Sequence, residues 1–256
     1  MAAICFLITE DIPVGKIWNL WLSNGNFNRF AHVSRGNEHC KKWLIDNNVN
    51  VVEEVNTSWG APSIATAMYN LYNSAFDTNE YCILVSQDTI PLLSCTELSD
   101  FLESKKISYL DNIDKFWWDN NKIETQLIEK YSKAIVASQF GILHKDAWLI
   151  IKDKWYTYFD EFSTIYNKEY ASEFAYYCMD EIFIPSMISM FDIPVIYRNI
   201  IHAEYDETDH GVFINISKLD ELILSKKYIM SRKYKDSPEL IKKLRLFNIL
   251  PGIQDK

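Results

Sequence analysis

The stretch Asn79–Ser94, NEYCILVSQDTIPLLS, decides how the rest of the chain is interpreted. Tyr81–Val85 is a short, nearly all-apolar run rich in β-forming residues, which predicts a strand covered on both faces. Ser86–Thr89 follow at once, and Pro91 then removes a backbone donor and fixes a turn. Because ligands of open α/β sheets bind beyond the carboxyl ends of such strands, this polar loop is a candidate site. The alternative is a solvated turn in which Asp88 or Thr89 caps a following helix.

Short apolar runs alternate with amphipathic segments along the whole chain. Strand-like runs lie at residues 3–9, 28–34, 50–55, 81–85, 134–143 and 194–201. Apolar residues have helical spacing at 16–23, 40–46, 63–76, 95–104, 145–152, 181–190 and 238–246, with Ser63 placed to cap the third of these helices. Residues 107–131 are polar and aromatic, and we expect an exposed loop there. The alternation predicts a mostly parallel, right-handed α/β sheet flanked by helices.

The composition argues against several classes of protein. The chain has 256 residues, 48% of them hydrophobic, with seven Gly, seven Pro and no repeat, which favours one compact domain over residues 1–256. A formal net charge of -9 argues against a general nucleic-acid binder. The five cysteines form no CxxC pair, so we expect reduced, buried thiols and neither a disulfide framework nor a zinc site. No apolar run in the sequence is long enough to span a membrane.

Asp180 and Glu181 are adjacent acids that open an apolar helical segment. The helix dipole stabilises a carboxylate at a helix N-terminus, so one interpretation is a structural cap. The other interpretation is a general base whose proton affinity is raised by a neighbouring hydrophobic wall. The local sequence leaves both interpretations open.

Ser231-Arg232-Lys233-Tyr234 lies in a basic segment of this acidic chain. Arg232 offers a bidentate fork and Lys233 a point charge, a combination that suits a diphosphate, while the alternative is a solvated basic surface. The loop after residue 85 carries a single acid, Asp88, and so lacks the Asp-x-Asp pair with which many nucleotide-sugar transferases hold Mg²⁺ or Mn²⁺. If a nucleotide binds here, something other than a two-carboxylate metal clamp must neutralise its phosphates.

A third group of polar residues follows the run at 194–201. His202, Asp206, Asp209 and His210 are metal-ligand types, but their spacing matches no recognised metal motif. A metal-dependent hydrolase built on them is therefore a weaker hypothesis than a solvated loop.

Seven stretches, in consistent order, resemble the core-2/I-branching family of glycosyltransferases, which includes β-1,6-N-acetylglucosaminyltransferases and peptide xylosyltransferases. The stretches are Ile4–Leu7 with Ile12-Pro13 and Ile17-Trp18, Phe30–Val33, Ser58–Ser63, Leu84–Leu92, Ala137–Phe140, Met179–Pro185 and Ile229–Tyr234. They are similar to the family's opening strand with its LP turn and Trp-bearing helix, its strand that ends at His, its Trp-Gly turn, and its stretches "LLSGSDIPL", "GSQW", "xDExFFPT" and "LFARKF". Each stretch alone is weakly specific, but seven in order across nearly the whole chain are distinctive.

The resemblance implies a glycosyltransferase A-type fold and an inverting, metal-independent transfer of a sugar, GlcNAc or xylose, from a UDP-sugar to a hydroxyl of a glycan or protein. By position in the matching motifs, Glu181 is the implied catalytic base, and Lys233 with Arg232 the implied contact to the donor diphosphate. No metal or other cofactor is expected. Residues 1–105 would then be mainly the nucleotide-binding half, and residues 106–256 mainly the acceptor and catalytic half.

Further site residues are expected from their places around these motifs. The expected donor contacts are His32, Val33, Ser34, Trp59 and Asp88, and the expected acceptor contacts are Asp180, Gln139, Trp117 and Trp118. Four positions depart from the family pattern, which bears on acceptor specificity more than on chemistry: Asp88 stands one place early, Ala137 replaces Gly, and Phe140 and Tyr205 each replace Trp.

A rival hypothesis is a carbohydrate- or nucleotide-sugar-binding protein that keeps the fold without turnover. The altered SQDT loop and the eight Trp and fifteen Tyr residues motivate it. The sequence shows neither the membrane anchor nor the paired cysteines of the secretory-pathway members. We therefore expect a soluble, cytoplasmic protein from a viral or microbial source, or else a catalytic domain cut from a longer Golgi-type chain, with no nucleic-acid partner.

Overall fold

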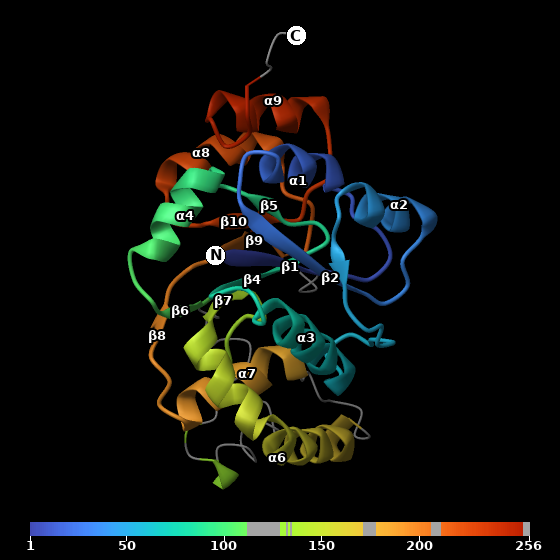
Figure 1. The fold of residues 1–256 in the computed structure, drawn as a ribbon, viewed down its shortest axis with the longest axis vertical. Helices are drawn as coiled ribbons and strands as arrows, with labels where there is room; N and C mark the ends of the chain where they lie inside the picture. The colour runs from blue at the N-terminus through green and yellow to red at the C-terminus, as the bar shows by residue number, and fades with distance from the viewer. Residues whose placement is uncertain (112–128, 132, 134, 171–177, 206–210, 253–256) are drawn as a thin grey trace.

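Figure 1 shows a computed structural model of the chain, which describes residues 1–111, 129–131, 133, 135–170, 178–205 and 211–252. Within these residues a seven-stranded sheet crosses the middle of the molecule, in the order β3-β2-β1-β4-β7-β6-β8. The strands are β1 (Ala2–Ile8), β2 (Phe27–Val33), β3 (Asn50–Val51), β4 (Tyr81–Ser86), β6 (Ser108–Leu110), β7 (Gly141–His144) and β8 (Val195–Tyr197). Neighbours pair in parallel except at β7, which runs antiparallel to both β4 and β6. The expectation of a mostly parallel sheet is confirmed.

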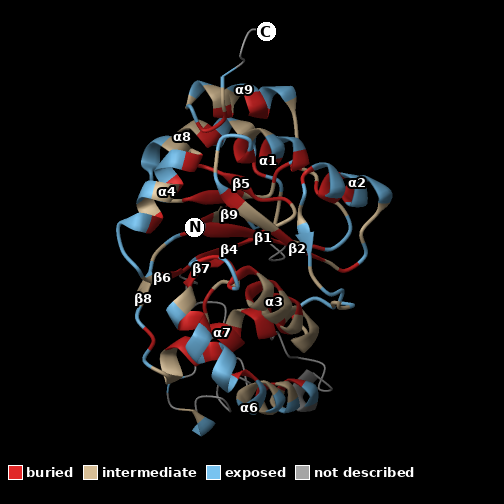
Figure 2. Cartoon of the chain, viewed as in Figure 1, coloured by how far each residue is buried: buried red, intermediate tan, exposed pale blue. Residues whose placement is uncertain are grey.

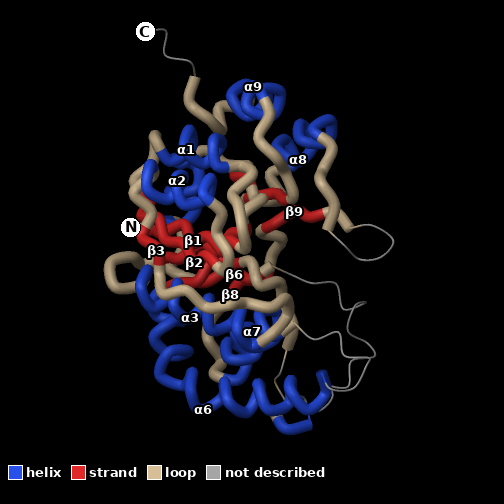
Figure 3. Tube along the Cα trace, turned by 90° about the vertical axis from the view of Figure 1, so that its right-hand side faces the viewer, coloured by secondary structure: helices blue, strands red, loops and turns tan. Residues whose placement is uncertain are grey.

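Helices cover both faces of this sheet, as Figure 1 and the rotated view in Figure 3 show. One face carries α1 (Gly15–Leu22), α2 (Glu38–Asp46), α4 (Cys95–Glu103), α8 (Leu219–Ser225) and α9 (Pro238–Leu246). The other face carries α3 (Pro62–Ala75), α6 (Lys145–Tyr170) and α7 (Met179–Met190). Across the described segments, every helix is too short or too polar to cross a membrane.

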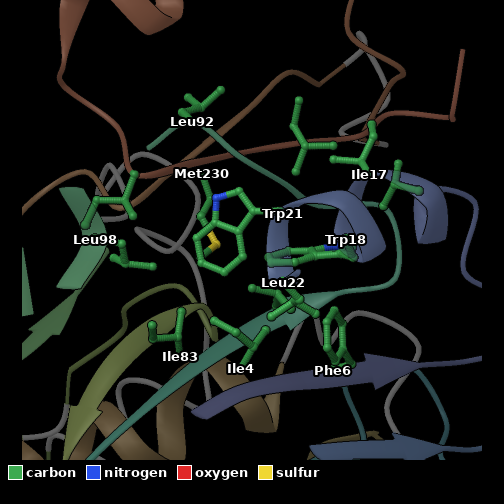
Figure 4. Packing of buried hydrophobic residues seen from close by; sticks show 14 of the residues in the cluster. Ile4, Phe6, Ile17, Trp18, Trp21, Leu22, Ile83, Leu92, Leu98 and Met230 are labelled. Carbon is green, nitrogen blue, oxygen red and sulfur yellow. The ribbon is translucent and has the colours of Figure 1, made fainter. Parts of the chain in front are cut away.

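The central strands are buried on both faces (Figure 2), because successive side chains of a strand point to opposite sides of the sheet. Ile4 and Phe6 point toward α1, where the Phe6 and Trp18 rings meet edge to face at 5.1 Å between centroids (Figure 4). Cys5 and Leu84 belong instead to the cluster under α3, α6 and α7. Each large side chain buried in this way contributes about 1.5–3 kcal/mol to the free energy of unfolding. The all-apolar run at 81–85 therefore forms the doubly covered strand that its composition predicts.

A second sheet brings segments that are remote in sequence to one place. In the described residues it has three strands in the order β5-β10-β9, formed by β5 (Ile90–Pro91), β10 (Met230–Arg232) and β9 (Ile201–Ala203). Ser231 lies opposite Ile90, and Arg232 lies opposite Ala203. The basic segment therefore lies directly beside the loop that follows β4.

The segment after β10 also returns to the first helix. The Asp236 carboxylate accepts hydrogen bonds from the backbone N–H groups of Lys16 at 2.8 Å and Ile17 at 3.3 Å. Both N–H groups lie in the first turn of α1, where donors commonly lack a helical acceptor, and the Ile17 N–H also bonds to the carbonyl of the N-cap residue Val14 at 3.1 Å. A residue far along the chain thus caps the helix that the N-terminal residues begin.

The strand predicted at 134–143 is wrong in its first part, because β7 begins only at residue 141. The backbone N–H of Ala137 donates to the Glu181 carbonyl at 3.0 Å, and that of Ser138 donates to the Asp111 carbonyl at 3.3 Å. Since these N–H groups bond to a helix and to a loop, the segment joins no strand ladder. The strand predicted at 50–55 is likewise shorter, since β3 contains two residues.

The strand predicted at 194–201 is divided between the two sheets. The carboxylate of Asp111 accepts hydrogen bonds from the N–H groups of Ile200 at 3.0 Å and Ile201 at 2.9 Å. The chain leaves β8 after Tyr197 and enters β9 at Ile201. A buried acid therefore marks the change of sheet, which falls at the polar pair Arg198-Asn199 inside the predicted strand.

Three helix expectations also need correction. Helix α3 begins at Pro62, and Ser63 accepts a hydrogen bond from the Ser58 N–H instead of capping the helix. Helix α6 continues to Tyr170, because buried Trp155 extends its apolar face past the charged run at 152–154. No helix follows the loop at 86–89, where the chain enters β5 instead, so the alternative of a helix cap there is wrong. Strand β6 lies within the predicted loop at 107–131.

Candidate active site

The turn after β4 is fixed by its own side chains. The Ser86 hydroxyl donates a hydrogen bond to Asp88 Oδ1 at 2.6 Å, and the Ser86 N–H donates to Thr89 Oγ1 at 3.2 Å. Thr89 is fully buried, and its carbonyl accepts a hydrogen bond from the Trp18 indole at 2.8 Å. The polar sequence Ser-Gln-Asp-Thr therefore forms a rigid turn anchored to the core.

This turn places the Asp88 carboxylate beside Arg232, one of the two residues predicted to contact the donor diphosphate. Asp88 Oδ1 lies 3.4 Å from Arg232 Nε, and the two side chains are 12% and 18% exposed. The guanidinium carbon of Arg232 lies 4.8 Å from the centroid of the Phe140 ring. Arg232 is therefore held between an acid and an aromatic face, a geometry that combines an ion pair with a cation–π contact.

Backbone bonds from two other segments fix the first turn of α7. The Met179 N–H donates to the Gly60 carbonyl at 2.8 Å, and Gly60 has a positive φ of 67° that glycine adopts without strain. Pro185 lies inside the helix and has no N–H, so it leaves the carbonyl of Glu181 without its helical donor. The Ala137 N–H supplies that bond at 3.0 Å. The predicted base thus sits on a backbone held from two sides.

The two acids of this turn both resist ionisation. Burial raises the pKa of Asp180 to about 6. Burial and the neighbouring charge of Asp180 raise the pKa of Glu181 to about 8, while Arg232 opposes that rise. The charge of Arg232 therefore reaches Glu181, and the predicted base and the predicted diphosphate ligand share one electrostatic environment.

The pKa of the Tyr205 hydroxyl depends on the charges of the same two residues, Arg232 and Glu181. Desolvation raises the pKa of its hydroxyl, Arg232 lowers it, and Glu181 raises it further. Tyr205 also forms a β-bridge with Gly211. A Cβ atom added at Gly211 would lie 2.9 Å from Lys233 Cε and 3.1 Å from its Nζ, so the Lys233 side chain runs across this glycine. Lys233 therefore lies beside Gly211, whose bridge partner Tyr205 is influenced by the charges of both Arg232 and Glu181.

The residues expected at the end of β2 have a different environment. His32 Nε2 accepts a hydrogen bond from the Val55 N–H at 2.9 Å, and burial lowers the pKa of the imidazole. Ser34 Oγ accepts from the Thr57 N–H at 3.1 Å. Val33 pairs with Ile8 where β2 and β1 both end. These residues hold the segment at 55–57 against the carboxyl ends of the first strands.

The expected acceptor residues lie in part beside α7. Gln139 and Asp180 line one small cavity of about 10 Å³. Trp59 is 75% exposed and adjoins Gly60, which holds the start of α7. Trp117 and Trp118 lie outside the described residues.

A family model for the core-2/I-branching enzyme matches residues 5–210 of the chain. The chain belongs to this family. It is a glycosyltransferase, and the α/β fold with its central sheet is the A-type fold expected from the resemblance. The matched range ends before β10, yet the ion pair between Asp88 and Arg232 joins the basic segment to the matched part.

Solved structures of glycosyltransferases are similar to this member of the core-2/I-branching family. The galactosyltransferase LgtC, in complex with donor and acceptor sugar analogs, is 12% identical, with a TM-score of 0.45 and 98% of each chain covered. The bifunctional glycosyltransferase WbbM is 14% identical, with a TM-score of 0.49 over 91% of this chain and 46% of WbbM. Mouse xyloside xylosyltransferase 1 is 8% identical, with a TM-score of 0.39 over 90% of this chain and 97% of its own. No curated protein matches the chain.

Two residues of this glycosyltransferase's site were not expected as ligands or supports. From the sequence, Phe140 is noted only as a replacement for Trp. In the structure its ring contacts the Arg232 guanidinium, and the aromatic character of this motif position is the signal that could have indicated such a contact. Asp111 anchors the start of β9, and the signal for it is an acid directly after a mostly apolar run.

His202 Nδ1 lies 3.4 Å from Ser231 Oγ in β10, whereas Asp206, Asp209 and His210 lie outside the described residues. No cluster of three metal-ligating side chains is found within the described part of the chain.

Proposed function

We propose that this glycosyltransferase moves GlcNAc or xylose from a UDP-sugar to a hydroxyl of a glycan or protein, with inversion and without a metal ion. The observation that carries the proposal is the position of Arg232, which pairs with Asp88 and acts electrostatically on Glu181. A fixed cation and a partly buried acid in one neighbourhood suit a reaction in which an anionic leaving group departs as a hydroxyl loses its proton.

Glu181 is the group proposed to accept the proton. The acceptor oxygen attacks the anomeric carbon from the face opposite UDP, its proton passes to the Glu181 carboxylate, and the bond from the anomeric carbon to the diphosphate oxygen breaks. One such displacement inverts the anomeric configuration. The elevated pKa of about 8 gives Glu181 a proton affinity suited to a general base, provided that the carboxyl is ionised before the reaction.

Arg232 and Lys233 are the groups proposed to stabilise the departing UDP. A guanidinium binds a phosphate through two parallel hydrogen bonds, and a lysine adds a compact charge. Preorganised cations aimed at the oxygen that gains charge in the transition state are commonly the largest contribution to such catalysis. The acid of the preceding turn, Asp88, is paired with Arg232, which supports a structural role for this carboxylate in place of metal binding.

The donor nucleotide is proposed to bind along the carboxyl ends of β1, β2 and β4, within residues 1–105. His32, Val33 and Ser34 lie there, and the crevice beyond the strand ends is where open α/β sheets bind ligands. Trp59, Gln139 and Asp180 are proposed to meet the sugars, since an exposed indole and polar groups beside the base suit a pyranose ring.

A thermal-shift screen followed by a UDP-release assay tests this function. UDP-GlcNAc, UDP-xylose and other nucleotide sugars are compared with and without Mn²⁺ and EDTA, since a ligand that binds the folded state raises its melting temperature. We expect a UDP-sugar to stabilise the protein, and EDTA to leave turnover unchanged.

The variant Glu181→Gln separates catalysis from binding. It should lose turnover by orders of magnitude while UDP still binds. Near-normal turnover in this variant would refute the assignment of the base. UDP binding by the unmodified protein without UDP release, across a panel of acceptors, would favour a carbohydrate- or nucleotide-sugar-binding protein, for which the protonated state of Glu181 near neutral pH is the favouring observation.

A further inference from the structure

Asp88 faces a cation that the proposed reaction needs for another purpose. Its carboxylate lies 3.4 Å from Arg232 Nε, the guanidinium nitrogen nearest the backbone. The fork that recognises a phosphate is formed by parallel N–H groups along one edge of the guanidinium. The contact at Nε is an ion pair without a hydrogen bond, and the Phe140 ring lies 4.8 Å from the guanidinium carbon, so the acid and the aromatic face together restrict the plane that carries this fork.

The Asp88 side chain is itself held in place. Ser86 Oγ donates to its Oδ1 at 2.6 Å, and the Asp88 carbonyl accepts a hydrogen bond from the Tyr234 N–H at 3.0 Å. The pairing of Ser231 with Ile90 joins the two segments just beyond. The turn and the basic segment thus form one rigid unit in which Asp88 and Arg232 face each other.

We propose that Asp88 is a positioning residue, which holds Arg232 in the orientation that engages the donor diphosphate and acts on the donor only through Arg232. This inference rests on the UDP-sugar function proposed above. A free arginine must lose rotational freedom when it binds a ligand, and an arginine that is ordered beforehand avoids that cost. The negative charge of Asp88 alone would repel a diphosphate. Its position beside Arg232, the proposed contact to that diphosphate, is therefore explained if Asp88 orients the arginine.

A double-mutant cycle on UDP affinity isolates this role. UDP binding is measured by titration calorimetry at one fixed salt concentration for the wild type, Asp88→Asn, Arg232→Gln and the double variant. Asparagine keeps the shape of the side chain and an oxygen that can accept the Ser86 hydrogen bond, but it removes the charge. We expect Asp88→Asn to weaken UDP binding about tenfold, or about 1.4 kcal/mol. In the Arg232→Gln background the same change should alter affinity less than about twofold.

Two further variants control the cycle. Asp220→Asn removes a carboxylate that pairs with Lys243 at 2.6 Å in the same basic region, and it should leave UDP affinity unchanged. Asp88→Glu restores a carboxylate and should recover part of the lost affinity, and it carries the test if the asparagine variant fails to fold. In turnover assays, KM for the donor should rise in Asp88→Asn while KM for the acceptor stays constant.

Each remaining outcome overturns the inference. Equal losses from Asp88→Asn in both backgrounds would mean that Asp88 contacts the donor directly. Tighter UDP binding in Asp88→Asn would mean that the acid acts as a repelling charge. Failure of the wild type to bind UDP would overturn the donor assignment and this inference together, whereas UDP binding with additive losses would overturn this inference alone.

Discussion

Replacing Asp180 with Asn should move the pH dependence of the enzyme toward neutrality. Asp180 is ionised when Glu181 titrates, because their pKa values are about 6 and about 8. Two like charges about 6 Å apart, at an effective dielectric constant of about 20, repel by about 3 kcal/mol. That energy corresponds to about two pKa units. Because Glu181 is only partly buried by its side-chain exposure, solvent screening should halve the effect, and we expect its pKa to fall by about one unit.

The consequence is largest near neutral pH. With a pKa of about 8, about a tenth of Glu181 is ionised at pH 7, whereas about half is ionised when the pKa is about 7. The measurement is kcat/KM for UDP-sugar turnover between about pH 6 and pH 9.5, since this ratio reports the pKa values of the free enzyme. The midpoint of the rising limb is the readout, because Asp180→Asn can also change the plateau through acceptor contacts.

Asp192→Asn serves as the matched control for this experiment. Asp192 directly follows the far end of α7 and pairs with Lys133 on an exposed surface. The same chemical change there should leave the midpoint where it is. If Asp180→Asn leaves the midpoint unchanged or moves it upward, the electrostatic account of Glu181 is wrong.

Three further predictions concern stability and the donor site. Glu181→Gln should raise the melting temperature at pH 8, because folding raises the pKa of Glu181 from 4.5 to about 8. The stability that this carboxyl contributes is therefore complete below pH 4.5 and is lost as the pH rises through 8. If the slope of melting temperature against pH is the same in the variant and the wild type, this prediction is wrong. Trp18→Ala should lower the free energy of unfolding by about 3–5 kcal/mol in urea titrations, as expected for a fully buried indole, and a loss below about 1 kcal/mol would show that the core relaxes around the site. Gly211→Ala should weaken UDP binding several-fold in calorimetry by displacing Lys233, whereas Gly252→Ala, with no atom within 4 Å of the added Cβ, should not; equal affinities in both variants would argue against a role for Lys233.

Local patterns in the sequence predict the central strands and their burial well. The run at 81–85 is apolar at every position, and an all-apolar strand is stable only between two layers. The helix predicted at 181–190 is also found, with its start two residues earlier at Met179, because its acids precede a mostly apolar run. These strands and helices are determined by residues that are close together in the sequence, so they can be predicted from the sequence alone.

The long-range contacts that build the site are much harder to predict. The pairing of Asp88 with Arg232 depends on β5 lying beside β10, and neither strand has more than three residues from which to infer a partner. The segment at 135–140 has the composition of a strand, but its hydrogen bonds go to α7 and Asp111. That outcome follows from Pro185, whose missing N–H leaves an acceptor that only the folded chain reveals.

The return of the chain from β10 to α1 affects the order in which the enzyme is completed during synthesis. Glu181 leaves the ribosome well before Arg232, and Asp236, which secures the first turn of α1, follows later still. Until the segment that contains β10 folds back, Glu181 lacks the guanidinium that lowers its pKa. The proposed base and the proposed cation therefore come together only after a segment that is synthesised late has returned to the first helix of the chain.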